Sequence, residues 1–168
     1  AKSVYRHLEQ RYQQIFWRER AMLRVIKSEQ QRQFASLRLS DPAYADYVNG
    51  WAESEQTISA PYGALHQTAT AYLDTRALLA AIKSELINNG CLHASRFDPA
   101  DLQLQAKVQW RGICSQYLVF CEGHQARFNP WFSSLPWQVA QGDILTVSVN
   151  KPLQTQIINY GQWLLPTS

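Results

Sequence analysis

Residues 62–90, YGALHQTATAYLDTRALLAAIKSELINNG, decide the fold together with residues 117–123, YLVFCEG. The part up to Leu73 is rich in aromatic, Thr and aliphatic residues, which favours a strand. Asp74 then supplies an N-cap for a helix over Thr75 to Asn89, whose large apolar residues recur at helical spacing on one face. Gly90 is suited to the left-handed position that ends such a helix.

The chain is expected to return to a sheet after this helix. Cys91 to Phe97 can form a strand beside the first one, which would make a β-α-β unit of the length that a parallel crossover needs. Tyr117 to Cys121 shows no alternation of polar and apolar residues, as is typical of a strand covered on both faces. We therefore expect both segments to lie inside a larger sheet.

The rest of the chain contributes further helices and strands. Periodicity and turn residues predict helices over Ser3 to Arg20, from Ser28 onward and over Ala43 to Trp51, strands over Met22 to Lys27 and Val139 to Val149, and a hairpin from Gln156 to Leu165 around Tyr160-Gly161. These elements predict the α+β (mixed α/β) class. We expect a mixed or antiparallel sheet with helices, plus a partial β-α-β layer.

Composition places the chain among ordinary globular proteins. Of its 168 residues 46% are hydrophobic and 17% charged, and this length suits one domain with a real core or two small lobes. No apolar run reaches bilayer length and the first residues lack the core of a signal peptide, so neither membrane insertion nor export is expected. Cys91, Cys114 and Cys121 cannot all pair with one another, and their apolar neighbours predict free buried thiols in a reducing cytoplasm.

Common catalytic and phosphate-binding motifs are absent from the sequence. The seven glycines are too far apart for a G-x-G-x-x-G or a P-loop, and neither G-x-S-x-G nor H-E-x-x-H occurs. Cys121 and His124 are spaced like half of a metal site, with Cys91 and His93 as possible partners. Because structural zinc sites usually show two clear ligand pairs, no metal is expected.

The order of parts from Tyr62 onward resembles the middle of the FAD-dependent oxidoreductases of the glycine and D-amino-acid oxidase type. The strand, helix start and turn of that family are similar to Gly63-Ala64-Leu65, Tyr72-Leu73-Asp74-Thr75 and Gly90-Cys91-Leu92, and its later strands to Leu118–Gly123, Trp137–Leu145 and Gln162–Pro166. Each piece is moderately specific, and the resemblance depends on their shared order. It extends more loosely to the opening helix and the strand at Leu23.

The resemblance implies that FAD is the cofactor and assigns positions to five residues. Phe97 and Asp98 would lie near the adenine, although the family often has Val at the first of these positions. Cys121, Glu122 and Gly123 would run under the adenosine end, with the glycine allowing close backbone approach. Cys-Glu here replaces a small Ala-Thr pair of the family. The alternative interpretation is structural, with Phe97 in a core and Gly123 in an ordinary turn.

The resemblance also implies a substrate and a division into lobes. The substrate would be a small amine or amino acid whose C–N bond is oxidised by hydride transfer to the flavin, with Trp163 facing it unless this side chain is part of the core. Residues 1–60 and 124–168 would belong to the substrate-binding lobe, and 61–123 would include a remnant of the FAD-binding lobe. The pyrophosphate loop of the family precedes position 1 and its last active-site strands follow Ser168. We expect the chain to be a central fragment that neither holds FAD tightly nor turns over.

Two other classes of function stay open. The chain could be a stand-alone α+β ligand-binding or protein-binding module whose aromatic loop, Phe128 to Trp137, contacts a partner. It could instead bind nucleic acid through its basic opening segment, because residues 1–38 hold nine Lys and Arg against three Glu. These charges are spread around the segment instead of forming one stripe, which favours a solvated surface, so no nucleic-acid partner is expected.

Overall fold

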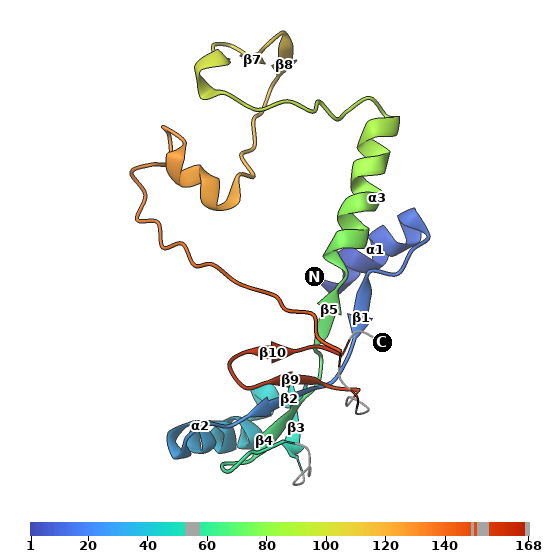
Figure 1. Cartoon of the computed structure of the whole chain (residues 1–168), viewed down its shortest axis with the longest axis vertical. Coiled ribbons are helices and arrows are strands. Elements are labelled where there is room, and N and C mark those ends of the chain that lie inside the picture. The colour runs from blue at the N-terminus through green and yellow to red at the C-terminus, as the bar shows by residue number, and fades with distance from the viewer. Residues whose placement is uncertain (53–57, 149, 151–154, 167–168) are drawn as a thin grey trace. The chain divides into compact units, whose positions relative to one another are not determined.

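A computed structural model of the chain describes residues 1–52, 58–148, 150 and 155–166 (Figure 1). The chain forms two compact units. We call Ala1–Leu92 with Ser148–Ser168 the first unit, and His93–Val147 the second unit. Helices occur together with mixed and antiparallel sheets, which confirms the α+β class.

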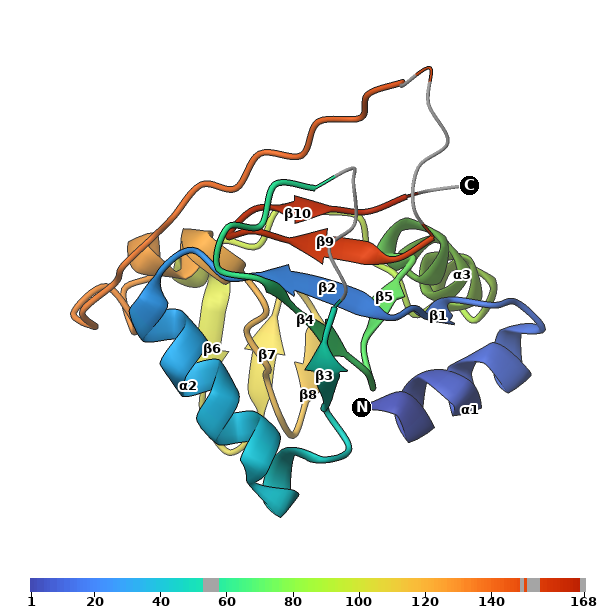
Figure 2. The same ribbon diagram turned by 90° about the horizontal axis from the view of Figure 1, so that it is seen from below.

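The first unit is built on a five-stranded mixed sheet with the order β10-β9-β2-β4-β3 (Figure 2). Its strands are β2 (Met22–Val25), β3 (Val48–Trp51), β4 (Ala64–Gln67), β9 (Ile157–Asn159) and β10 (Trp163–Leu164). Strand β2 pairs antiparallel with β4 and parallel with β9, and β9 and β10 form the predicted hairpin. Every residue of β9 and all but Arg24 of β2 are buried, because these strands lie inside the sheet and β10 and β3 form its edges.

Helix α2 (Glu29–Ser40) lies against one face of this sheet (Figure 2). The helix begins after Ser28, as the sequence predicted. The Ser28 side chain caps it by accepting a hydrogen bond from the backbone N–H of Gln31 at 3.2 Å. Ala35 of the helix packs with Ile26 and Leu65 in the core of the unit. The sheet and the helix therefore stabilise each other mainly by apolar burial.

The segment after α2 differs from its prediction. A 3-10 turn, η1 (Pro42–Tyr44), leads directly into the edge strand β3. The helix predicted over Ala43 to Trp51 is therefore wrong. Asp41 caps the short turn by accepting from the backbone N–H of Ala43, and Gly50 adopts a φ of +91°, which a continuous helix excludes.

Helix α1 (Lys2–Tyr12) is shorter than the predicted segment from Ser3 to Arg20. Gln13 takes the left-handed conformation with φ 51°, and the chain then turns into β1 (Trp17–Glu19). Strand β1 pairs antiparallel with β5 (Ala71–Leu73). The helix prediction fails after Tyr12 because the residues beyond it gain strand pairing and a buried position for Phe16.

Helix α3 (Thr75–Asn88) confirms the helix prediction at the centre of the sequence. The Asp74 side chain accepts from the backbone N–H of Ala77 at 3.0 Å, and Gly90 has a φ of +64° just beyond the last turn. Glu85 connects α3 to α1, because its carboxylate pairs with Arg11 and accepts from the Tyr12 hydroxyl.

The second unit contains an antiparallel meander of β6 (Leu102–Leu104), β7 (Val108–Trp110) and β8 (Ile113–Ser115). Two 3-10 turns, η2 (Pro99–Asp101) and η3 (Gly123–Phe128), flank it in the chain. Ring contacts connect the meander to the segments on either side of it. We call these residues the aromatic cluster: His93, Phe97, Trp110, Phe120, Trp131 and Phe132.

The predicted β-α-β unit does not form. Cys91 to Phe97 and Tyr117 to Cys121 are both without strand structure, so they are not neighbours in a sheet. Val139 to Val149 is likewise not a strand over its described residues 139–148. A strand needs a neighbour that satisfies its backbone groups, and residues 93–147, all of them described, contain only the short meander. Apolar side chains of these segments are consequently exposed, with Tyr117 81% and Ile144 95% accessible.

Candidate functional site

The two segments predicted to meet FAD lie together in the second unit. The ring of Phe97 is 5.7 Å from that of Phe120 and 5.6 Å from that of Trp110, measured between centroids. Asp98 and Cys121 directly follow Phe97 and Phe120 in sequence. The contact between these two rings therefore brings the two segments together, although neither segment is a strand. Both rings are half-buried in the aromatic cluster.

The polar side chains of these segments already have partners. The Asp98 carboxylate accepts from the backbone N–H of Ala100 at 2.9 Å and so caps η2. The Glu122 carboxylate accepts from the side-chain amide of Asn129 at 2.8 Å, and Asn129 in turn accepts from the backbone N–H of Trp131. The arrangement holds the turn of η3 in place, because Asn129 is buried and would otherwise lose its hydrogen bonds to water.

Gly123 and Cys121 leave open backbone at the start of η3. Gly123 has a φ of +55°, and a Cβ there would meet no atom within 4 Å.

The thiols of Cys91, Cys114 and Cys121 are exposed, so the prediction of buried thiols is wrong. Cys91 and Cys121 lie in segments that were predicted to be strands and form none, and Cys114 lies on the outer strand β8 of the meander.

Trp163, the residue predicted to face substrate, belongs to the first unit. It lies on the edge strand β10 opposite Asn159, and its side chain is 66% accessible. The alternative interpretation, that Trp163 is part of the core, does not hold. A side chain on an edge strand is exposed to solvent where no neighbouring element packs over it.

A pocket of about 430 Å³ in the first unit was not predicted from sequence. It lies where α2 and η1 meet the sheet, and its wall includes Arg24 of β2, Arg38 of α2 and Gln67 of β4. We call it the Arg24 pocket. Tyr44 and Phe34 add aromatic surface, so cationic and apolar groups line the same hollow.

The charge of the Arg24 pocket is unbalanced. None of its lining residues is a carboxylate, and within the described part of the chain neither Arg24 nor Arg38 forms an ion pair. The guanidinium of Arg38 lies 5.7 Å from the centre of the Tyr44 ring. The available signal in sequence was Arg24 itself, a charged residue inside the apolar run Met22 to Ile26.

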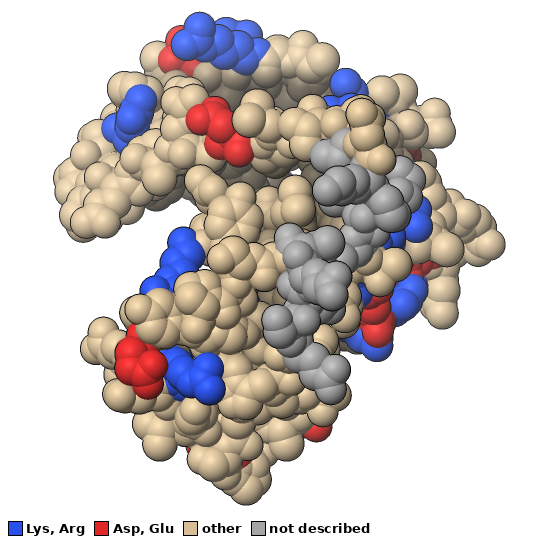
Figure 3. Space-filling model, turned by 60° about the horizontal axis from the view of Figure 1, so that its bottom comes forward, with Lys and Arg blue, Asp and Glu red and all other residues tan. Residues whose placement is uncertain are grey.

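On the face in Figure 3 the Lys and Arg side chains appear in separate groups among uncharged residues. Several already have partners, such as Arg11 with Glu85 and Arg111 with Asp101 at 2.6 Å. This distribution offers no continuous basic stripe on that face for a phosphate backbone to follow.

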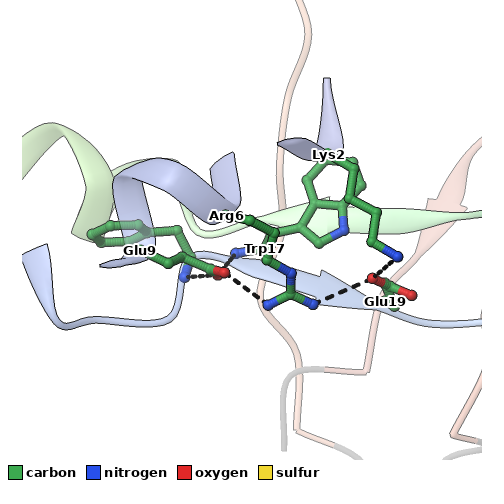
Figure 4. Close-up of polar contacts among 6 residues, drawn as sticks. Lys2, Arg6, Glu9, Trp17 and Glu19 are labelled. Atoms are coloured by element: carbon green, nitrogen blue, oxygen red, sulfur yellow. Dashed lines mark hydrogen bonds and ion pairs between the residues drawn. The ribbon is translucent and has the colours of Figure 1, made fainter. Parts of the chain in front are cut away.

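A cluster of charged side chains joins α1 to β1 (Figure 4). Arg6 lies between Glu9, at 2.7 Å, and Glu19, at 3.3 Å, and Lys2 contacts Glu19 at 2.8 Å. The carboxylate of Glu9 also accepts from the backbone N–H groups of Phe16, at 2.8 Å, and Trp17, at 2.7 Å. The cluster therefore closes the turn after α1.

These contacts keep Glu9 ionised. The hydrogen bond from Trp17 is the largest cause that lowers the pKa of Glu9 below its usual value, with those from Phe16 and Arg6 acting in the same direction. The pKa of Glu19 is lowered chiefly by its hydrogen bond with Lys2. A carboxylate whose oxygens are occupied by several donors is poorly suited to exchange protons with a substrate, so the cluster is structural.

The described residues form neither a metal site nor a membrane-spanning helix. Residues 1–52, 58–148, 150 and 155–166 contain no group of three or more His, Cys, Asp or Glu placed to hold a metal ion. In this part of the chain no helix is both long and apolar enough to cross a bilayer. Comparison with protein-family models and with solved structures found no match for this chain.

Proposed function

We propose that the chain is part of an FAD-dependent oxidoreductase that oxidises a C–N bond of an amine or amino acid, and that it supplies mainly substrate-binding structure. One observation carries the proposal. Strands from residues 1–60, β2 and β3, and from residues 124–168, β9 and β10, share one mixed sheet, in which β4, from the range 61–123, lies between β2 and β3. These are the two ranges that the sequence resemblance assigns to the substrate-binding lobe.

The connection between the two ranges is made in the middle of the sheet. Met22 pairs with Ile157 and Leu23 with Ile158 in a parallel register, and each of these four side chains is buried. A parallel contact between segments so distant in sequence is costly in chain entropy and is held by extensive burial. This supports one lobe made from both ranges.

The chain alone does not fit a complete FAD site. Phe97 packs in the aromatic cluster, Asp98 caps η2 and Glu122 holds Asn129, which leaves mainly the open backbone near Gly123 for the cofactor. Backbone of that kind suits an edge contact with adenosine, but it provides no loop of N–H groups for the pyrophosphate. In the complete enzyme the flavin would accept the hydride, and the residues described here would position substrate and cofactor.

The test compares the 168-residue chain with the product of the complete reading frame that contains it. We expect the purified chain to be colourless and the complete product to be yellow, with flavin absorbance that bleaches anaerobically when an amine or amino-acid substrate is added. A complete product without flavin, or with flavin that a broad set of amines and amino acids never reduces, contradicts the proposal.

A stand-alone binding module is the second candidate, because the second unit exposes much apolar surface. Phe128, Trp131, Leu135 and Trp137 of the aromatic loop are all exposed. Exposed apolar surface of this kind is typical of a protein contact. A complete product that lacks flavin and elutes in a defined complex with another protein through this loop would favour the second candidate.

A further inference from the structure

The Arg24 pocket has the size and lining of a small-molecule site. Its volume of about 430 Å³ falls in the range of ligand pockets, roughly 300–1,000 Å³. Strands β2, β3 and β4, helix α2 and the turn η1 all contribute to the wall. All five elements belong to the first unit, so no residue of the second unit is needed to form the pocket.

Two guanidinium groups give the pocket its chemical character. Arg24 and Arg38 both line it, and no lining residue carries negative charge. The acidic residue nearest in sequence to η1, Asp41, already accepts from the backbone N–H of Ala43 at 2.9 Å. A guanidinium presents a planar set of donors that matches the two oxygens of a carboxylate, so an oxyanion would balance the charge.

The amide groups supply further unused polar capacity. The Oε1 of Gln67 is buried and has no hydrogen-bond partner among the described residues. Gln31 uses its own Oε1 to accept from the backbone N–H of Lys27 at 3.1 Å, and its Nε2 can donate. This oxygen of Gln67 only accepts hydrogen bonds, so an arginine of the wall or a water can complete it, whereas a bound carboxylate cannot. The amide groups that can donate to an anion are the Nε2 groups of Gln31 and Gln67.

The apolar part of the wall limits what the anion can be. Phe34, Tyr44 and Tyr47 line the pocket together with Ile26 and Leu65. A bare inorganic ion would leave this surface in contact with water, whereas a ring attached to a carboxylate would cover it. Aromatic surface next to an arginine also favours a planar ligand.

We propose that the Arg24 pocket binds a small aromatic or similarly planar carboxylate. Arg24 and Arg38 hold the carboxylate, and the ring of the ligand lies against Phe34 and Tyr44. The proposal does not depend on the oxidation chemistry proposed above. Trp163, the residue predicted to face the oxidised substrate, is not among the lining residues.

The experiment titrates the 168-residue chain with three probes of similar shape: benzoate, phenyl phosphate and benzamide. Binding is measured by calorimetry and by amide chemical shifts of Arg24, Arg38 and Gln67. We expect benzoate to bind and to shift these amides, and neutral benzamide to bind at least about tenfold more weakly, the ratio expected for loss of a charge-assisted hydrogen bond.

Variants locate the site. Arg24→Gln and Arg38→Gln should each weaken benzoate binding by about tenfold or more, and Gln67→Glu should abolish it by adding negative charge to the wall. Arg76→Gln, on an exposed position of α3 outside the pocket, is the matched control and should bind as the unaltered chain does. Circular dichroism of each variant shows whether it is folded, and the probe comparison in the unaltered chain needs no variant.

Three results would overturn the proposal. The first is equal binding of benzamide and benzoate, which would make the charges irrelevant. The second is unchanged binding in both folded arginine variants. The third is binding of phenyl phosphate without binding of benzoate, which would assign the pocket to phosphate esters. Failure of the flavin test leaves each of these measurements unaffected.

Discussion

The two units of the molecule are stabilised in different ways. Among the residues that the structure describes, all of the buried apolar ones belong to the first unit except Ala126. In the first unit five strands and a helix exclude water from Leu23, Ile26 and their neighbours. The second unit has a meander of three-residue strands and the aromatic cluster, whose rings are half-buried or, at His93 and Trp131, exposed. Pairing of strands that are distant in sequence therefore produces a buried core in the first unit, whereas aromatic contacts alone produce a thinner core in the second unit.

The largest expected effect tests the core of the first unit. Leu23→Ala removes a side chain that is 1% accessible in the central strand β2, and should lower the free energy of unfolding by about 2–5 kcal/mol. Leu79→Ala is the matched control, because Leu79 on α3 is 64% accessible and its change should stay within about 0.5 kcal/mol. Urea denaturation followed by circular dichroism measures both variants. Equal losses would mean that the core is not where the sheet places it.

A smaller effect is expected in the second unit. Phe120 contacts the rings of Phe97, Trp131 and Phe132, with centroid distances of 5.3 to 5.7 Å. Phe120→Ala should therefore destabilise this unit by about 1–3 kcal/mol, because the ring is only half-buried.

The readout for Phe120→Ala has to separate the units. Hydrogen exchange measured by mass spectrometry should accelerate in peptides from residues 93–147 and remain unchanged in peptides from β2 and β4. Phe128→Ala, at an exposed ring that contacts only Arg127 among the ring contacts described, should change the free energy by less than about 1 kcal/mol. Acceleration in both units would show that they unfold together and would remove the distinction between them.

Local signals made the first unit the more predictable one. The ends of α3 follow from Asp74 and Gly90, and the β9–β10 hairpin follows from the turn at Tyr160-Gly161. Each of these signals acts within a few residues. They therefore survive whatever the rest of the chain does.

The failures have the opposite character. Tyr117 to Cys121 has the composition of a covered strand, but strand structure requires a partner, and composition cannot supply one. The predicted helix beyond Tyr12 fails because Glu9 accepts from two backbone N–H groups several residues ahead. The Arg24 pocket was missed for a related reason, since its wall comes from five separate elements and appears only when they are folded together.

The smallest expected effect concerns the turn that Glu9 closes. A carboxyl group with a lowered folded pKa stabilises the protein above its unfolded pKa, near the ordinary value of 4.5, and that stabilisation is lost as the pH falls through the lower folded value. Glu9→Gln should therefore be less stable than the unaltered chain at pH 7, and the difference should shrink below about pH 4.5. The effect is small because glutamine retains one oxygen that can accept from Phe16 and Trp17.

Thermal unfolding of both proteins between pH 7 and pH 3 measures this difference. The acid titration of Glu85 is common to the two proteins and cancels, whereas that of Glu19 cancels only in part because Arg6 contacts both Glu9 and Glu19. A gap in melting temperature that stays constant down to pH 3 would show that the charge of Glu9 does not stabilise the turn. Exchange of the Trp17 amide should follow the same pH dependence, because that N–H donates directly to the carboxylate. Peptides of residues 93–147 should show no difference between the two proteins, since the turn belongs entirely to the first unit.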